Sequence, residues 1–208
     1  MIFGLISGNL KLMSNPITYN ASGADNQQES SQEEKWLSKI PQNLGYYLAG
    51  FVDGEGSFNV SLRQKSDYAI KWQVVLSFNV SQRDMTNLLT LKEVLGCGII
   101  KKRKDGVYSL DITTPQRVIL RVIPFFRKFP FRSEKAIKNF AIFCKIAALM
   151  SLGNHRHKKG LKEIVSIRET LNVGAGRKRK YNEADVLKSL LEKSSETIRQ
   201  APIKSEMI

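Results

Sequence analysis

The spacing of apolar residues changes period several times along the chain, and each change predicts a new element. Residues 43–53 form a helical pattern with these apolar positions on one face: Leu44, Tyr47, Leu48 and Phe51. After a glycine-containing turn, residues 57–63 alternate apolar and polar side chains, and residues 70–81 do so again. Such alternation is typical of strands with one buried and one open face, so these two stretches predict a β-hairpin.

The second half of the pattern repeats the first in outline. Residues 84–95 are helical in period, and residues 98–103 and 107–112 are two strands around an Asp-Gly turn. Two further helices are predicted at 115–127 and 133–150. The fold class is therefore α+β, with an αββαββα core, helices on one face of a four-stranded antiparallel sheet, and C-terminal helices.

Composition divides the chain into three parts. Residues 1–40 are a polar leader that is expected to be disordered, because residues 14–34 offer few groups to bury, although order is expected to begin near residue 35. Residues 41–150 form the core domain. Residues 151–208 are a helical extension that contains a basic hinge at 177–180, predicted to contact phosphate, and a final amphipathic helix at 183–199.

Charge narrows the choice of partner. The chain has 33 Lys and Arg against 19 Asp and Glu, a net charge of +14, and residues 1–40 contribute none of the excess. A compact domain that positive favours a polyanionic partner: nucleic acid first, an anionic membrane surface second. The apolar runs are far shorter than the roughly 18 residues that span a bilayer, so we expect no membrane partner. Cys97 and Cys144 form no CxxC pair, which argues against a zinc knuckle or a disulfide framework.

The polar face of the predicted sheet carries side chains suited to DNA bases. Arg and Lys match guanine, Asn and Gln match adenine, and Ser is permissive; the alternative is an ordinary solvated face. The predicted DNA-binding residues are Asn59, Ser61, Arg63, Lys65, Lys71, Gln73, Ser77, Asn79, Lys101, Arg103 and Ser109.

One carboxylate stands out at the end of the first helix. Glu55 follows a helix whose second face carries Gly45, Ala49 and Gly50, small residues that allow a second helix to approach closely. Two such helices around a two-fold axis would bring two Glu55 carboxylates together on a basic surface, where a hard divalent cation such as Mg²⁺ would relieve their repulsion. The alternative is a glycine-rich turn with solvated carboxylates, which is commoner for an arbitrary Asp-Gly-Glu-Gly.

The segment LAGFVDGEG at residues 48–56 resembles the motif of the LAGLIDADG homing endonucleases, and the β-β-α-β-β pattern after it resembles their fold. The nearest likeness is to single-motif, homodimeric members encoded in organellar group I introns. The resemblance implies that Glu55 binds Mg²⁺, with Mn²⁺ as a substitute, that the Gly54 carbonyl is a second metal ligand, and that Gln82 positions water. It also implies a basic catalytic residue: Lys135 is our choice and Lys138 the alternative.

The resulting prediction is a site-specific DNA endonuclease that makes a metal-dependent double-strand cut in a long pseudo-palindromic target, as a homodimer. Two alternatives use the same fold: a maturase that binds intron RNA and does not need Glu55, and a non-catalytic DNA-binding regulator. The resemblance alone places the protein in an organelle, chloroplast or mitochondrion.

Overall fold

The computed structural model describes residues 35–173 and 179–199, and it confirms the α+β fold. The strands are β1 (Gly56–Gln64), β2 (Trp72–Gln82), β3 (Ile99–Lys102) and β4 (Tyr108–Ile112). All pairs are antiparallel and the sheet order is β1-β2-β4-β3. The predicted hairpins are therefore present, and β2 and β4 join them into one sheet.

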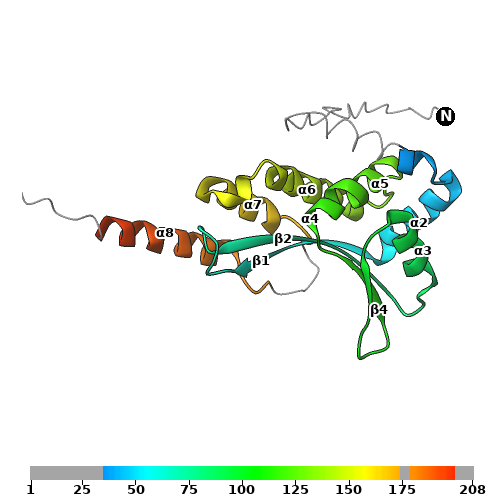
Figure 1. The fold of residues 1–208 in the computed structure, drawn as a ribbon, viewed down its shortest axis with the longest axis horizontal. Coiled ribbons are helices and arrows are strands. Elements are labelled where there is room, and N and C mark those ends of the chain that lie inside the picture. The colour runs from blue at the N-terminus through cyan, green and yellow to red at the C-terminus, as the bar shows by residue number, and fades with distance from the viewer. Residues whose placement is uncertain (1–34, 174–178, 200–208) are drawn as a thin grey trace, which may run out of the picture.

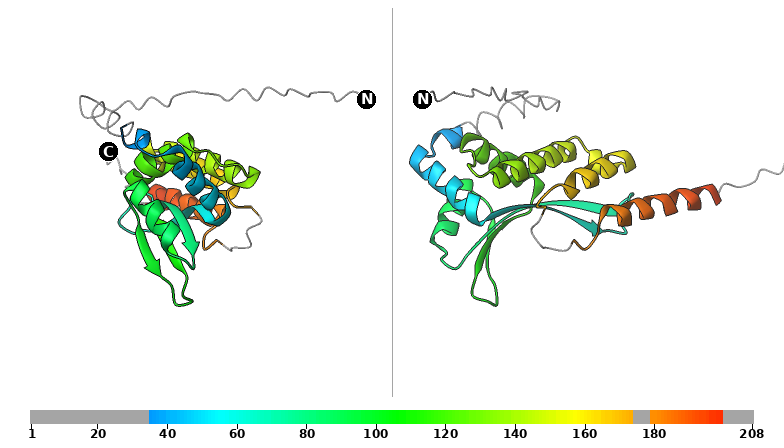
Figure 2. Two further views of the ribbon diagram at one scale, coloured as in Figure 1. Left: turned by 90° about the vertical axis from the view of Figure 1, so that its right-hand side faces the viewer. Right: turned by 180° about the vertical axis from the view of Figure 1, so that it is seen from behind.

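The helices follow the predicted order. They are α2 (Gln42–Glu55), α3 (Thr86–Leu95), α4 (Pro115–Arg117), the π-helical turn η1 (Val118–Val122), α5 (Ile123–Lys128), α6 (Glu134–Ser151), the 3-10 turn η2 (Asn154–Arg156), α7 (Lys158–Glu169) and α8 (Glu183–Arg199). Figure 1 shows α4 to α7 as a layer over one face of the sheet, with α2 and α3 at one end. Helix α8 extends past the other end, beyond the β1–β2 hairpin, in Figures 1 and 2. None of the described helices is long and apolar enough to cross a membrane.

Phenylalanines hold the helical layer on the sheet. Phe58 of β1 contacts Phe78 of β2 as well as Phe126, Phe131 and Phe143 from the helical side, with ring centroids 5.1–5.8 Å apart. Each buried aromatic ring removes a large apolar area from water, and tilted or edge-on pairs add to that gain. The described helices do not cover the opposite face of the sheet and, as Figure 1 shows, the sheet curves so that this face is concave.

The domain boundary at residue 40 was placed too late in the chain, whereas residue 35, where order was expected to begin, is the first described residue. Ile40 is buried, and the indole Nε1 of Trp36 donates to the carbonyl oxygen of Val94 at 2.8 Å. The Arg121 guanidinium lies 4.6 Å from the Trp36 ring centre. Residues 35–40 therefore pack on the core, because a tryptophan and an isoleucine supply apolar area that the preceding polar residues lack. The rest of the predicted leader lies outside the described residues.

Two corrections concern basic residues. Lys71 precedes β2 with a φ of 57°, in the tight turn that returns from Lys65, so neither lysine belongs to a strand. The predicted phosphate-binding role of the hinge is wrong for Arg179, whose guanidinium donates to the carbonyl oxygens of Arg168 and Leu171 at 2.9 and 2.6 Å and pairs with Glu169. Arg179 thus caps the carboxyl end of α7, where backbone carbonyls lack helical partners. Residues 177 and 178 lie outside the described residues.

Candidate active site and nucleic-acid interface

Helix α2 turns a different face to the core from the one predicted. Its buried residues are Gly45, Leu48, Ala49 and Val52, whereas Tyr47 is 56% exposed. A Cβ on Gly45 would lie 2.3 Å from the ring of Phe129 in the same chain, and Ala49 is only 2% exposed. Assigning Gly45 and Ala49 to a dimer interface was therefore wrong, because the segment after α5 occupies their face.

A different small-residue face remains exposed on α2. Gly50, the third predicted interface residue, is exposed, and so is Gly54 four residues later. A Cβ added to either glycine would meet nothing within 4 Å. Because residues four apart share a helix face, the Gly50–Gly54 face offers bare backbone to an incoming helix.

Glu55 is the last residue of α2 and is exposed. Its position is fixed by Gly56, where a Cβ would lie 2.4 Å from the Val52 side chain and 2.6 Å from the Val52 carbonyl oxygen. The conformation of Gly56 is extended rather than left-handed, so this glycine is needed for close approach and not for an unusual φ. The chain can therefore pass directly from helix into β1 and leave Glu55 at the junction.

Gln82 lies at the same end of the sheet as Glu55. Gly56 pairs with Val80, so Gln82 at the end of β2 continues past that pair towards the end of α2. The Gln82 Oε1 atom accepts a hydrogen bond from the backbone N–H of Arg83 at 2.8 Å. The register thus gathers two of the predicted catalytic side chains at one edge, although they are 27 positions apart in sequence.

The donor set at this edge suits a hard cation. The Glu55 carboxylate is exposed, and the Gly54 carbonyl belongs to the last turn of α2, where carbonyls lack helical partners and the helix dipole is negative. Oxygen ligands of this kind match Mg²⁺. No cluster of three or more His, Cys, Asp or Glu occurs in the described parts of the chain. A complete coordination shell would therefore need oxygen atoms other than those of a carboxylate cluster in the described residues, such as phosphate oxygens.

Asp53 ties the end of α2 to the start of α6. Its carboxylate accepts from the backbone N–H groups of Arg132 and Ser133 at 2.9 and 2.8 Å, and from the Ser133 hydroxyl. Burial alone would raise the pKa of Asp53, but these hydrogen bonds outweigh it and the pKa lies below the ordinary value of 3.8. Asp53 is therefore a fixed hydrogen-bond acceptor that joins two helices rather than a free metal ligand.

Replacing Asp53 with Ala is expected to lower the free energy of unfolding by about 1–2 kcal/mol at pH 7, because two solvent-exposed backbone N–H groups and the Ser133 hydroxyl lose a charged acceptor. The folded-state pKa is depressed, so this stabilisation exists above the unfolded pKa and fades as pH falls through the folded value. Urea unfolding at pH 7 and at pH 3 measures both. The difference between wild type and variant should shrink at pH 3, whereas Asp67→Ala, in the β1–β2 loop, should matter at neither pH. A constant difference would contradict this role.

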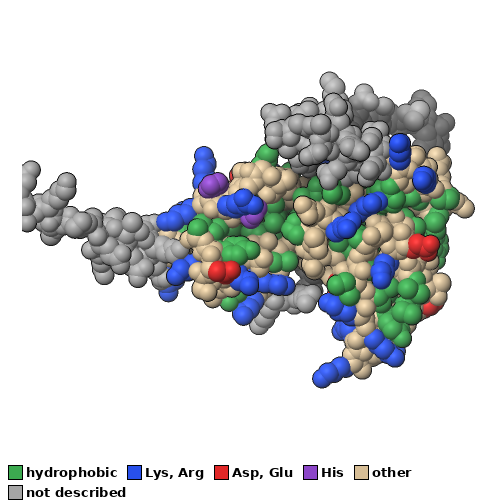
Figure 3. Space-filling model, viewed as in Figure 1, with side chains coloured by type: hydrophobic (Ala, Val, Ile, Leu, Met, Phe, Trp, Pro, Cys, Tyr) green, Lys and Arg blue, Asp and Glu red, His purple; other side chains and the backbone are tan. Residues whose placement is uncertain are grey.

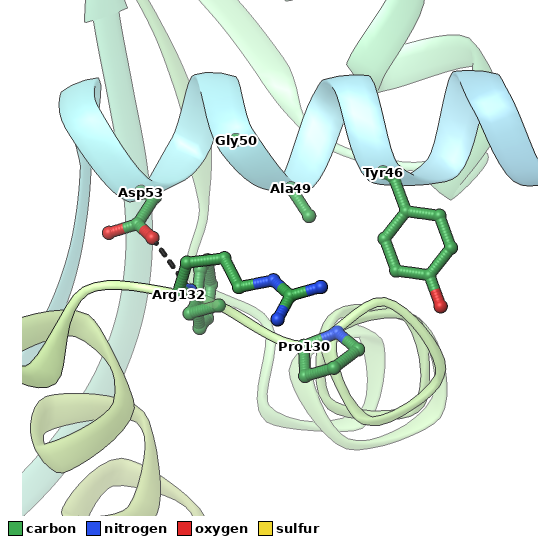
Figure 4. A pocket seen from close by; sticks show the side chains of 7 residues that line it. Tyr46, Ala49, Gly50, Asp53, Pro130 and Arg132 are labelled. Atoms are coloured by element: carbon green, nitrogen blue, oxygen red, sulfur yellow. Dashed lines mark hydrogen bonds between the residues drawn. The ribbon is translucent and has the colours of Figure 1, made fainter. Parts of the chain in front are cut away.

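Basic residues at the start of α6 lie close to the end of α2, which Asp53 joins to Ser133. Lys135 and Lys138 lie exposed in the first two turns of α6, whose N-cap, Ser133, is bound by Asp53. Arg132, which we did not predict, lines a pocket of about 200 Å³ with Tyr46, Gly50 and Asp53. Figure 4 shows its guanidinium group beneath Ala49 and beside Tyr46. The fold therefore adds Arg132 as a third candidate beside Lys135 and Lys138, one that only the Asp53 contact reveals.

The open face of the sheet carries most of the predicted DNA-binding residues. The strand register places Asn59 opposite Ser77, Arg63 opposite Gln73, and Lys101 opposite Ser109. Ser61 pairs with Val75 and Asn79 with Asp111 on the same face, while Arg103, Lys65 and Lys71 lie in the turns. Figure 3 shows Lys and Arg side chains along the lower side of the molecule, around the β3–β4 hairpin, with few Asp or Glu nearby.

The alternation also puts two residues on this face that we did not predict. Ile99 is 63% exposed and is the register partner of Asp111. An exposed apolar side chain on such a surface is suited to a thymine methyl group. Asp111 is the more unexpected, since a carboxylate on a cationic face needs a specific role. The parity of β4 identified Ser109, and extending it by two residues would have identified Asp111.

Comparisons with known proteins agree with this geometry. The family model described as LAGLIDADG endonuclease matches residues 48–147. DNA endonuclease I-CvuI of Chlorella vulgaris is 34% identical over 84 residues, which cover 38% of this chain and 52% of that protein. The match thus spans about half the length of this curated relative.

Solved structures extend the likeness over more of the chain. The homing endonuclease I-TnaI is 31% identical with a TM-score of 0.61, over 71% of this chain and 96% of its own. The archaeal intron-encoded homing endonuclease I-Vdi141I, solved in complex with DNA, is 27% identical with a TM-score of 0.66, over 73% and 96%. The motif, the sheet order and these likenesses agree: this chain belongs to the LAGLIDADG endonuclease family.

Proposed function

We propose that this protein is a homing endonuclease that cuts both strands of a long, nearly palindromic DNA duplex as a homodimer. One observation carries the proposal: an exposed carboxylate, Glu55, lies at the negative end of α2, at the edge of a concave, cationic sheet face. A polyanion bound to that face would bring phosphate oxygens to the carboxylate.

The exposed Gly50–Gly54 face supplies the contact between protomers. Packing two such faces around a two-fold axis brings the two α2 helices close together and both Glu55 residues to the centre of a continuous DNA-binding surface. A two-fold dimer is matched by a DNA target with the same symmetry. Each protomer then acts on one strand.

Glu55 and the Gly54 carbonyl would hold Mg²⁺, for which Mn²⁺ can substitute. The bound ion supplies Lewis-acid stabilisation of charge on phosphate oxygens and lowers the pKa of bound water. Gln82 orients water at the same edge, and a cation from the start of α6 (Lys135, Lys138 or Arg132) faces the developing negative charge. The sheet fixes the register of the DNA so that the target phosphate meets these groups.

Purified protein provides the test. The substrate is a duplex made by joining the sequences that flank the DNA element carrying the reading frame. With Mg²⁺ we expect one double-strand break in this duplex and none in a scrambled duplex, and EDTA should abolish cleavage. An intact substrate under these conditions would contradict the proposal.

An intron maturase is the second candidate, because the same basic face could bind structured RNA. The two candidates differ in their need for the carboxylate. A maturase would promote splicing of the intron transcript equally well with Glu55→Gln, and it would leave the duplex uncut. An organellar location, which the resemblance implied, also stays a prediction.

A further inference from the structure

A chain of side-chain hydrogen bonds crosses the open face of the sheet. Asn79 Nδ2 donates to Asp111 Oδ1 at 2.7 Å, and Asn79 Oδ1 accepts from Asn59 Nδ2 at 3.3 Å. Asn59 Oδ1 in turn accepts from Asn172 Nδ2 at 3.2 Å. The chain therefore runs from Asn172, after α7, across β1 and β2 to Asp111 on β4.

Each end of this hydrogen-bond chain is fixed by a group that can only accept a hydrogen bond. Asn172 Nδ2 also donates to the backbone carbonyl oxygen of Phe58 at 2.7 Å, and a carbonyl can only accept. At the other end, the Asp111 carboxylate accepts from Ser109 Oγ at 3.1 Å and lies 3.3 Å from Lys101 Nζ. Because an acceptor stands at each end, the orientation of every amide between them is determined.

Asn59 and Asn79 each keep part of their hydrogen-bonding capacity for DNA. An amide nitrogen has two hydrogens and its oxygen two lone pairs. Asn59 Nδ2 uses both hydrogens, on Ser57 Oγ at 2.9 Å and on Asn79. Asn79 uses one hydrogen and one lone pair in the contacts of the described residues, so one of each remains.

That remainder matches one base edge in the major groove. Adenine presents the N7 acceptor beside the N6 amino donor, and an Asn amide can pair with both at once. Asn59 keeps only an acceptor, which does not distinguish adenine from cytosine because both carry an amino group. Of the two linked asparagines on this face, Asn79 is thus the one that keeps the complete adenine pattern in the contacts of the described residues.

We propose that Asn79 selects an adenine in each half of the target, and that Asp111 and Asn172 are positioning residues that fix the orientation of its amide. The proposal rests on the proposed function, since it requires the sheet to lie in the major groove. The proposal also gives the C-terminal extension a part in specificity. The backbone N–H of Asn172 donates to Asn139 Oδ1 of α6 at 3.0 Å, so the core holds Asn172, the first member of the hydrogen-bond chain, in place.

The test is a base-preference profile. Every base pair of the joined-flank duplex is changed in turn, and relative cleavage rates are measured for wild type, Asn79→Ala, Asp111→Asn and Asn172→Ala. Wild type should prefer adenine roughly 10- to 100-fold at one position of each half-site. Asn79→Ala and Asp111→Asn should remove most of that preference at the same position, and Asn172→Ala should weaken it less, because Asp111 still holds Asn79.

The control is Asp67→Asn, which makes the same charge change in the β1–β2 loop and should leave the profile unchanged. A preference for another base at the Asn79-dependent position would overturn the proposal, as would an unaltered preference in both Asp111→Asn and Asn172→Ala. Failure of the endonuclease function looks different, because wild type would then cut no duplex. In that case the side-chain amide NMR signals of Asn59 and Asn79 still decide: they should shift in both positioning variants, and unshifted signals would refute the chain.

Discussion

Replacing Glu55 with Gln is expected to reduce the rate of DNA cleavage by roughly 10³-fold or more while leaving DNA binding intact. Gln has nearly the same shape but no charge, so the proposed cation site loses the carboxylate that each α2 helix would supply. Metal-derived stabilisation of the transition state amounts to several kcal/mol, and every 1.36 kcal/mol changes a rate about tenfold. Single-turnover cleavage in Mg²⁺ and binding in Ca²⁺, measured on the same duplex, separate the two effects.

Two further variants make the result specific to this site. Glu55→Asp keeps the carboxylate one methylene closer to the backbone, so it should retain much more activity than Glu55→Gln. Glu163→Gln removes an equivalent charge from exposed α7 and should cut like wild type. Affinity of Glu55→Gln should equal or exceed that of wild type, because a negative charge near phosphate has been removed. Cleavage at the wild-type rate by Glu55→Gln would rule out this carboxylate as the metal ligand.

If the protein forms the proposed dimer, replacing Gly50 with Leu is expected to convert it into a monomer. A leucine side chain on the exposed Gly50–Gly54 face would separate the two α2 helices, and overpacking costs about 1–3 kcal/mol at each copy. The two-fold axis doubles that cost to about 2–6 kcal/mol, so the dimer dissociation constant should rise by roughly 30-fold to 2 × 10⁴-fold. Sedimentation should then give 23.5 kDa instead of twice that mass, and double-strand cutting should be lost.

Loss of the dimer must be distinguished from loss of the fold. Gly50 has a helical conformation with open space at its Cβ, so Leu should keep or raise the thermal stability of the monomer by up to about 1 kcal/mol. Ala141→Leu adds a comparable side chain at an exposed position of α6 and should leave the dimer intact. A Gly50→Leu protein that remains dimeric would place the interface elsewhere.

The spacing of apolar residues and the residues of the Asp-Gly turn were sufficient to predict the order of helices and strands. Alternation in residues 57–63 and 70–81 identified β1 and β2 to within two residues, and the Asp-Gly pair identified the β3–β4 hairpin. These signals are local: side chains two apart in a strand, or three to four apart in a helix, share a face whatever the rest of the chain does. The same parity placed the predicted strand residues on the open face.

The faces of α2 could not be read in this way. Its small residues lie at 45, 49, 50 and 54, and the sequence does not say which pair packs inside its own chain. Phe129, more than 80 positions later, decides which face packs inside the chain, because its ring fills the space over Gly45 while Gly50 and Gly54 have no such neighbour. The sequence pattern grouped the wrong glycines because the deciding neighbour is distant along the chain.

The sequence by itself therefore determined the order of elements, the basic character of the open face and the carboxylate at the end of α2, because each depends on residues close together in the chain. Only the tertiary structure decided which glycines face a partner, that Asp53 joins α2 to α6, and that Asn172, Asn59, Asn79 and Asp111 form one chain of hydrogen bonds. Those features depend on contacts between residues 20 to 113 positions apart, which fold topology sets and local periodicity does not.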